Sequence, residues 1–286
     1  ESSDGSYGYG SVLSSVFAKS SAGEKIEIID SAISNNKNVG NPRRYGVMDV
    51  AYINMDITNS TIDGNESSYM GGALRYSTGT LEITESTFDG NEAGTEGGAF
   101  VANKATVNLV GTGENGNVFS NNEAGANGGA INAQGNGTQV DLTGKNTFKN
   151  NAAGNNGGAI WLLGGTVSTL NVDGEAIFEN NNANGAGGAI FSQTGAVVNF
   201  IGDATFTGNK ANGVDNDIHN DGTVNVKQGA IVRLGGGITG SGTTNINGGV
   251  LELGGNNRIG ILKVSDGGKI AFGEKGHLDV DEIDES

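Results

Sequence analysis

Short runs in which apolar and polar residues alternate follow one another along this 286-residue chain. Thr80–Thr84 (TLEIT) and Thr169–Asp173 (TLNVD) are typical examples. Because successive side chains of a β-strand point to opposite faces, this period of two predicts strands with one buried face. No window shows a sustained helical period, and the 52 glycines together with many asparagines favour tight turns. The pattern therefore predicts an all-β chain of short strands and tight turns.

One double motif recurs with a fixed internal spacing. Phe148-x-x-Asn151 is followed by Gly157-Gly158-Ala159-Ile160, so the first glycine lies nine residues after the phenylalanine. Four further complete copies keep this spacing, and they begin at Ile62, Phe88, Phe119 and Phe178. A degenerate copy begins at Ile33, and a sixth copy begins at Phe206 but lacks the Gly-Gly-Ala part. Successive copies start 26 to 31 residues apart, and all of this variation falls after the glycine pair, where we expect loops.

An array of units of this length buries its apolar side by stacking each unit on its neighbours. We therefore predict a single-stranded parallel β-helix, right-handed, with nine to ten coils and a repeat of 26–31 residues. In the coil that contains Trp161 we expect three strands, at Gly158–Leu162, Ser168–Val172 and Ala176–Glu179. Trp161 itself should face outward.

Equivalent residues of neighbouring coils would stack about 4.8 Å apart and form ladders. Stacked phenylalanines would fill the interior, stacked asparagines would satisfy one another's amides, and glycines would occupy a corner that a Cβ would obstruct. The predicted ladder residues are Phe88, Phe119, Phe148, Phe178, Phe206, Asn91, Asn122, Asn151, Asn181, Asn209, Gly98, Gly129, Gly158 and Gly188.

The repeat divides the chain into three parts. Residues 1–46 are predicted to form irregular capping coils, with a first strand within Val12–Phe17. They include the loop Asn41–Tyr45, which carries the only proline and the only Arg pair. We interpret this loop as an exposed turn, with a contact site for an anionic ligand as the alternative. Residues 47–220 are predicted to form the regular array, and residues 221–286 leaner coils with an acidic end.

Composition narrows the possible partners. The net charge of −16 and the lack of a basic stripe argue against nucleic acid and anionic membrane surfaces. The chain has no cysteine, which excludes disulfides and thiolate metal sites. No segment approaches the ~18 consecutive apolar residues of a membrane-spanning helix, so we expect no membrane insertion of this segment. No phosphate loop or metalloprotease motif is present, and we expect no cofactor and no bound metal.

The best candidates for chemistry lie where the array breaks, in the run VDNDIHND. Its ionisable residues are Asp215, Asp217, His219 and Asp221. They could form a metal or acid/base site; we favour a substituted corner with polar turn residues. A separate acidic row follows the repeat asparagine at Glu66, Glu92 and Glu123. Three stacked carboxylates could hold Ca²⁺, but we expect them to be solvated.

The paired motifs, Phe-x-x-Asn and Gly-Gly-Ala followed by Ile, Leu or Phe, resemble those of the chlamydial polymorphic outer-membrane proteins over about Ile62–Ile218. That family is similar to the autotransporters, which have a secreted β-helical passenger and a C-terminal outer-membrane barrel. The resemblance implies a passenger segment on the bacterial cell surface, anchored in the outer membrane through a part absent here. It also implies a role in adhesion and virulence. The start at Glu1, without Met or signal peptide, fits a processed or trimmed piece.

Three functions remain open at this point. The first is a non-catalytic adhesin or rigid display scaffold that binds a protein or glycan of a host-cell or bacterial surface. The second is a structural subunit that associates with itself, because the ends of a β-helix are open edges. The third is a polysaccharide lyase or hydrolase on a β-helix, for which Asp215, Asp217, His219 and Asp221 would be the site candidates. We predict the first and expect no enzyme activity.

Overall fold

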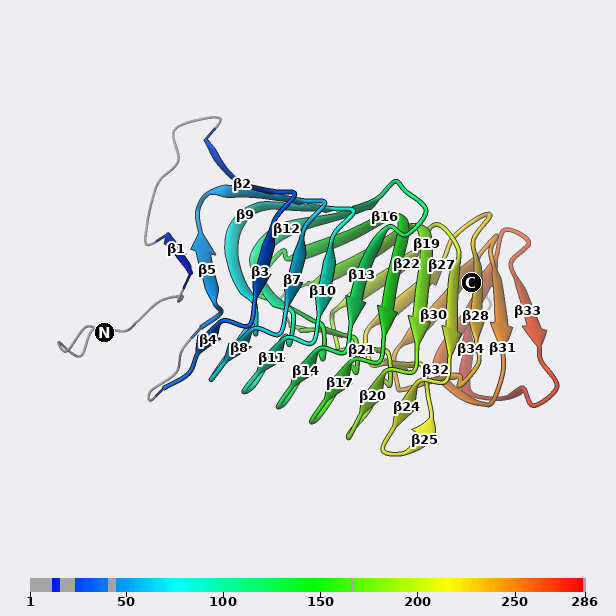
Figure 1. Cartoon of the computed structure of the whole chain (residues 1–286). Helices are drawn as coiled ribbons and strands as arrows, with labels where there is room; N and C mark the ends of the chain where they lie inside the picture. The colour runs from blue at the N-terminus through cyan, green and yellow to red at the C-terminus, as the bar shows by residue number, and fades with distance from the viewer. Residues whose placement is uncertain (1–11, 16–23, 41–44, 166, 285–286) are drawn as a thin grey trace.

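The computed structural model describes residues 12–15, 24–40, 45–165 and 167–284 as one continuous β-solenoid, and no helix occurs among them. Each coil has three faces made of parallel strands, which pair with the equivalent strands of the coils before and after. A short fourth strand projects at a corner between the third and first faces, so that the corner strands form a sheet of their own (Figure 1). The all-β parallel fold predicted from the repeat is confirmed.

The strands of each face follow the alternation in the sequence. The first face contains β1 (Leu13–Ser15), β5 (Met48–Ala51), β15 (Ile131–Gln134), β18 (Ile160–Leu162), β21 (Ile190–Ser192), β26 (Ile218–Asn220) and β29 (Ile238–Thr239). The second contains β2 (Lys25–Ile29), β6 (Asn54–Thr58), β22 (Val197–Phe200), β27 (Thr223–Val226) and β30 (Thr243–Asn247). The third contains β3 (Ala32–Ser34), β7 (Thr61–Asp63), β10 (Thr87–Asp89), β13 (Asn117–Ser120), β23 (Ala204–Thr207), β28 (Ile231–Leu234), β31 (Val250–Leu253) and β33 (Lys269–Phe272).

Six longer strands continue round a bend from one face to the next. From the first to the second face run β9 (Leu74–Thr84), β12 (Phe100–Gly111), β32 (Asn256–Ser265) and β34 (His277–Asp284); from the second to the third run β16 (Gln139–Lys149) and β19 (Thr169–Glu179). In the Trp161 coil, the second and third predicted strands are therefore one strand, β19. Gly174 sits at the bend, and a Cβ there would lie 2.3 Å from the carbonyl oxygen of Gly144 in the preceding coil.

The corner sheet shows how many turns have the full cross-section. It contains β4 (Lys37–Asn38), β8 (Glu66–Ser67), β11 (Glu92–Ala93), β14 (Glu123–Ala124), β17 (Ala152–Ala153), β20 (Asn182–Ala183), β24 (Lys210–Ala211) and β25 (Val214–Asp215). The first seven are parallel, and β25 folds back antiparallel on β24. About seven turns have the full cross-section, fewer than the nine to ten coils predicted, and the coils after them are shorter. Past β25 the corner strand is absent, and Val224 pairs with Thr244 only 20 residues later.

The core is a narrow column of stacked side chains. Phe88, Phe119, Phe148, Phe178 and Phe206 are buried and lie in one row. Their neighbouring ring centroids are 5.1, 5.0, 5.0 and 4.6 Å apart, with nearly parallel planes. Aliphatic residues of the second face complete the column. Each coil can bury its ring only between the rings of its neighbours, which explains why so lean a sequence still folds.

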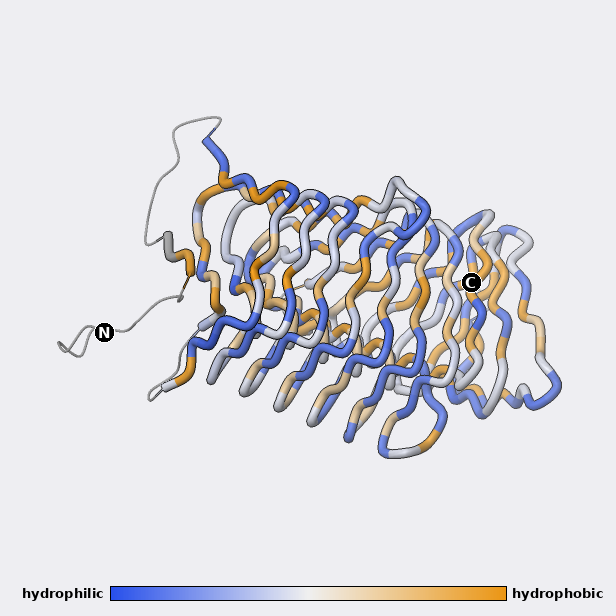
Figure 2. The backbone as a smooth tube through the Cα atoms, in the orientation of Figure 1, coloured by the Kyte–Doolittle hydropathy of each residue, from blue (hydrophilic) through white to orange (hydrophobic). Residues whose placement is uncertain are grey.

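The repeat asparagines form a buried amide ladder at the bend between the third face and the corner sheet. Figure 2 shows this bend as a hydrophilic row that recurs coil after coil. From Asn36 to Asn209, each Nδ2 donates to the Oδ1 of the next asparagine at 2.9–3.0 Å. In the middle of the ladder each amide also bonds two backbone groups; Asn122, for example, accepts from the N–H of Asn91 and donates to the carbonyl of Phe88. All the amide dipoles therefore point the same way.

The second glycine of each pair lies where neighbouring coils come closest. A Cβ on Gly98, Gly129, Gly158 or Gly188 would sit 2.0–2.3 Å from a carbonyl oxygen of the next coil. Real Cβ atoms are not found at such distances from backbone atoms, so the coil spacing itself requires glycine here.

Candidate functional site

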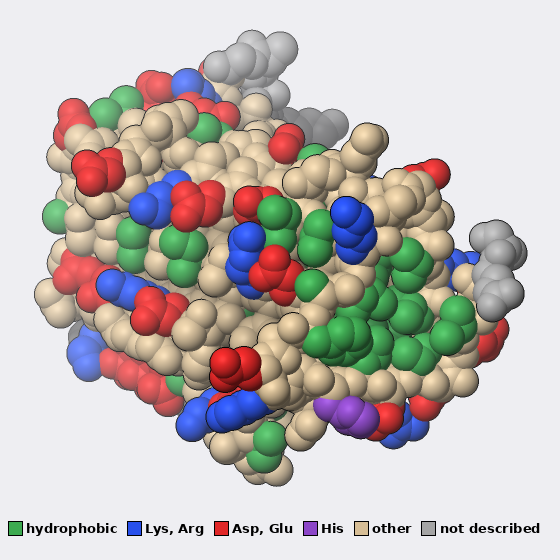
Figure 3. Space-filling view, turned by 90° about the vertical axis from the view of Figure 1, so that its right-hand side faces the viewer, with side chains coloured by type: hydrophobic (Ala, Val, Ile, Leu, Met, Phe, Trp, Pro, Cys, Tyr) green, Lys and Arg blue, Asp and Glu red, His purple; other side chains and the backbone are tan. Residues whose placement is uncertain are grey.

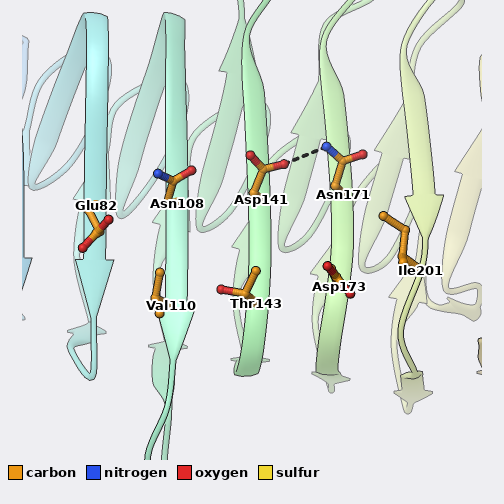
Figure 4. Close-up of a pocket in the computed structure, with 8 residues that line it drawn as sticks. All are labelled: Glu82, Asn108, Val110, Asp141, Thr143, Asn171, Asp173 and Ile201. Atoms are coloured by element: carbon orange, nitrogen blue, oxygen red, sulfur yellow. Dashed lines mark hydrogen bonds between the residues drawn. The ribbon is translucent and has the colours of Figure 1, made fainter.

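A groove outside the core lies on the outer surface of the second face. It has a volume of about 460 Å³ and crosses the coils of β9, β12, β16 and β19 (Figure 4). One row of side chains along its floor runs parallel to the solenoid axis and consists of Glu82, Asn108, Asp141 and Asn171. A second row, two residues further along each strand, consists of Val110, Thr143 and Asp173, and Ile201 lines the end beyond β19.

Strand alternation produces both rows. Leu81 and Ile83 point into the core and are fully buried, so Glu82 between them must point outward. Parallel pairing without a register shift then places Asn108 beside Glu82, and Asp141 beside Asn108. Residues that are 26 to 33 positions apart in the chain thus become nearest neighbours on the surface.

An amide ladder on the outside of the solenoid enters this groove. Asn245, Asn225 and Asn199 each donate through Nδ2 to the Oδ1 of the asparagine one coil earlier, at 2.8 Å. Asn171 then donates to Oδ1 of Asp141 at 2.7 Å. Oδ2 of Asp141 accepts from Nε2 of Gln139, also at 2.7 Å. The outer ladder therefore ends on a carboxylate whose two oxygens both accept amide hydrogens.

The groove carries negative charge without a built-in counter-ion. Glu82, Asp141 and Asp173 line it, and no Lys or Arg does. None of the three takes part in a salt bridge among the described residues. Elsewhere in the row of Glu82 the charges are paired, since Lys25 contacts Asp56, and Lys263 contacts Asp284, both at 2.5 Å.

This arrangement is suited to hydrogen bonding. Its lining contains no His or Ser, and no group of three His, Cys, Asp or Glu side chains in the described parts of the chain could hold a metal ion. Carboxylates supply acceptors, whereas the amides and the Thr143 hydroxyl supply both donors and acceptors. The groove can therefore bind a polar ligand along the axis.

Asp217, a residue singled out in the sequence, ends the internal amide ladder. It occupies the place of Ala189 of the preceding coil and is fully buried. Its Oδ1 accepts from Nδ2 of Asn209 at 2.9 Å, and its Oδ2 accepts from the backbone N–H groups of Gly236 and Gly237 at 2.6 and 3.1 Å. Burial raises the pKa of Asp217 to about 6, although these three donors act in the opposite direction. Its position is that of a cap for the ladder.

His219 and Asp221 meet on the outer surface of the first face. Nε2 of His219 lies 3.1 Å from Oδ2 of Asp221, and its Nδ1 lies 3.1 Å from Oγ1 of Thr239. The ring of Phe191 stacks on the imidazole with a centroid distance of 5.0 Å. Where a carboxylate, an imidazole and a hydroxyl lie in a row, the imidazole can act as the base that activates the hydroxyl. None of the three lines the groove on the second face.

The other candidates lie apart from these groups. Asp215 is exposed on strand β25 of the corner sheet, whereas His219 lies on the first face. Glu66, Glu92 and Glu123 are neighbours in the corner sheet, and Lys37 pairs with Glu66 at 2.5 Å. Trp161 projects from the outer side of the first face but is only 9% exposed. Residues 41–44 of the proline loop, and Val16 and Phe17 of the first predicted strand, lie outside the described residues.

Two features were missed by the sequence reasoning. The first is the groove with its outer ladder. Its only signal in the sequence is an Asn, Asp or Glu at the equivalent outward position of successive second-face strands. A second internal polar ladder lies at another bend, where Asn117 donates to Asn146 at 3.1 Å and accepts from the N–H of Ser86. Its members change from Ser to Asn along the axis, so no motif marks them.

Comparison with known proteins gives one family match. The model of the Chlamydia polymorphic membrane protein repeat matches residues 118–134, 147–162 and 175–193. Each match begins on or just before a third-face strand, crosses the corner sheet and ends on the first face, so it covers the phenylalanine, the asparagine and the glycine pair. No curated protein and no solved structure matches the chain. No helix long and apolar enough to cross a membrane occurs in the part of the chain that the structure describes. The central coils of this solenoid therefore match the Chlamydia polymorphic membrane protein repeat over these three segments.

Proposed function

We propose that this chain is a passenger segment of a bacterial cell-surface protein, and that it acts as a rigid, non-catalytic scaffold for adhesion. The match to the Chlamydia polymorphic membrane protein repeat carries the proposal, since membrane proteins of that name place such repeats at a cell envelope. The ligand would be a protein or glycan on a host-cell or bacterial surface.

The physical properties of the solenoid support such a role. Continuous parallel pairing over about seven turns and two directional amide ladders make a stiff rod. A rod of this kind holds its outward side chains at fixed spacings, which suits a binding surface more than a site that must close around a substrate. The acidic groove on the second face offers a polar surface for contact.

Adhesion can be tested with the purified chain. Fluorescently labelled protein should bind to intact epithelial cells in a saturable manner, as measured by flow cytometry, and excess unlabelled protein should compete. Heat-unfolded protein serves as the control. Absence of saturable binding to a panel of host and bacterial cells would remove the adhesin proposal.

Self-association is a second candidate, and exposed apolar side chains favour it. Figure 3 looks onto the end formed by the last coils and shows hydrophobic side chains gathered there. Val264, Phe272 and Ile283 are 47%, 56% and 64% exposed. Contact with another solenoid end would bury them, at roughly 25 cal/mol per Å² of apolar surface. Light scattering across a concentration series, followed by electron microscopy, separates the candidates: filaments would favour this one, and a monodisperse rod would count against it.

A further inference from the structure

We propose that the groove on the second face binds a neutral, linear oligosaccharide that lies along the solenoid axis. This proposal rests on the proposed adhesive function and names the ligand class for one face of the scaffold. The groove is defined by the two rows of side chains between Glu82 and Ile201.

The hydrogen-bonding groups of the groove select the class of ligand. Glu82, Asp141 and Asp173 can only accept hydrogen bonds, whereas Asn108, Asn171 and Thr143 can donate as well. Ammonium and guanidinium groups only donate, so they would give no acceptor to the Asn108 amide and the Thr143 hydroxyl. Phosphate and sulfate only accept, and the carboxylates would repel them. Sugar hydroxyls both donate and accept, and therefore match every group in the groove.

The apolar side chains at the rim fit the same class. Ile201 is 43% exposed, and Val110 lies in the second row, level with Thr143 and Asp173. Aliphatic groups of this kind can pack against the C–H faces of sugar rings while the hydroxyls reach the polar row. The groove has no exposed aromatic ring, so we expect weak binding per sugar unit and a need for several units.

The direction of the groove selects a linear ligand. Asn108 and Asp141 are paired residues of adjacent coils, and so are Val110 and Thr143, so both rows repeat at the strand spacing of about 4.8 Å. A chain of sugar units presents hydroxyls at regular intervals, and each added unit can contact the next coil.

A second groove, of about 390 Å³ on the third face, lacks these properties. Its main polar side chains, Arg233 and Glu252, already pair with each other at 3.0 Å. Its charges therefore form an ion pair within the protein, whereas the carboxylates of the first groove form none with the described residues.

The test is a binding titration with the whole chain. Soluble cello-, xylo-, manno- and malto-oligosaccharides of increasing length are the probes, with heparin and poly-lysine as charged comparisons. We expect at least one neutral series to bind, with affinity that rises with length. Asp173→Ala should raise the Kd about five- to tenfold, because an acceptor for a hydroxyl is lost. Glu92→Ala removes an exposed carboxylate from the corner sheet and should leave the Kd unchanged.

Three results would overturn the proposal: no neutral oligosaccharide binds at millimolar concentration, binding is insensitive to Asp173→Ala, or poly-lysine binds more tightly and loses affinity in the same variant. Cell binding by the variants distinguishes this failure from failure of the adhesive function. If Asp173→Ala binds cells as the wild type does, adhesion stands and the groove is not its site. If the wild type binds neither cells nor sugars, both proposals fail.

Discussion

Asn151→Ala is the substitution that tests the internal amide ladder most directly. The Asn151 side chain makes four hydrogen bonds: Nδ2 donates to Oδ1 of Asn181 at 2.9 Å and to the carbonyl of Phe119 at 3.0 Å. Oδ1 accepts from both Nδ2 and the backbone N–H of Asn122, each at 3.0 Å. The residue is fully buried, so solvent reaches none of these groups.

The cost follows from which groups lose their partners. Oδ1 of Asn181 still accepts from the backbone N–H of residue 151 in the variant, so this acceptor stays satisfied. The backbone N–H of Asn122 and one of its Nδ2 hydrogens have no other partner in the structure. Two buried donors without acceptors cost about 1–3 kcal/mol each, so we expect a loss of about 2–6 kcal/mol. A water molecule entering the space would place the result near the lower end.

Chemical unfolding in urea, followed by fluorescence of the single tryptophan, measures this loss. Trp161 lies on the first face directly after the corner of the mutated coil, so it reports on the affected region. Asn182→Ala is the matched control, because Asn182 is an exposed asparagine of the corner sheet. If Asn151→Ala unfolds at the same urea concentration as Asn182→Ala, the ladder does not stabilise the solenoid in the manner described.

Three further predictions concern the core, the corner and pH. Phe148→Ala should lower the unfolding free energy by about 3–5 kcal/mol, because it opens a gap in a continuous stack; calorimetry of wild type and variant measures this. Gly129→Ala should cost at least about 1–3 kcal/mol or prevent folding, since its Cβ would lie 2.0 Å from a backbone oxygen; circular dichroism during thermal melting checks this. The pKa of Asp217 is raised to about 6 in the folded state, against ~3.9 in the unfolded chain. Between about pH 4 and 6 the Asp217 carboxyl is therefore protonated in the folded state but ionised in the unfolded chain. Stability from this group is therefore present below about pH 4 and lost as pH rises through 6, by about 3 kcal/mol. The urea midpoint of the wild type should fall from pH 4.5 to pH 7.5, and that of Asp217→Asn should not show this fall. An equal change of the midpoint in the two proteins would contradict the prediction.

Much of the fold could be predicted because one motif repeats with constant spacing. In the five complete copies the first glycine lies nine residues after the phenylalanine or isoleucine, and in the structure that segment is the corner common to the central coils. The number of turns could not be predicted in the same way. The strands after Thr223 follow the same alternation, but they belong to shorter coils without a corner strand.

The role of Asp217 illustrates a partial prediction. The sequence showed that the glycine–glycine–alanine motif breaks there, and that polar residues replace it. It did not show that a carboxylate is needed at this point, where the next asparagine of the ladder is missing. Only the fold brings Asn209 and the N–H groups of Gly236 and Gly237 to the same carboxylate, because they come from two different coils.

By itself the sequence determined the strand period, the stacking of equal units and the identity of the internal phenylalanine and asparagine ladders. These follow from local alternation and from a motif whose residues are close together in the chain. Only the tertiary structure decided the outer groove, because Glu82, Asn108 and Asp141 belong to different coils and differ in type. Stacking in register makes them neighbours, and no local pattern in the sequence records which outward residues will share a row.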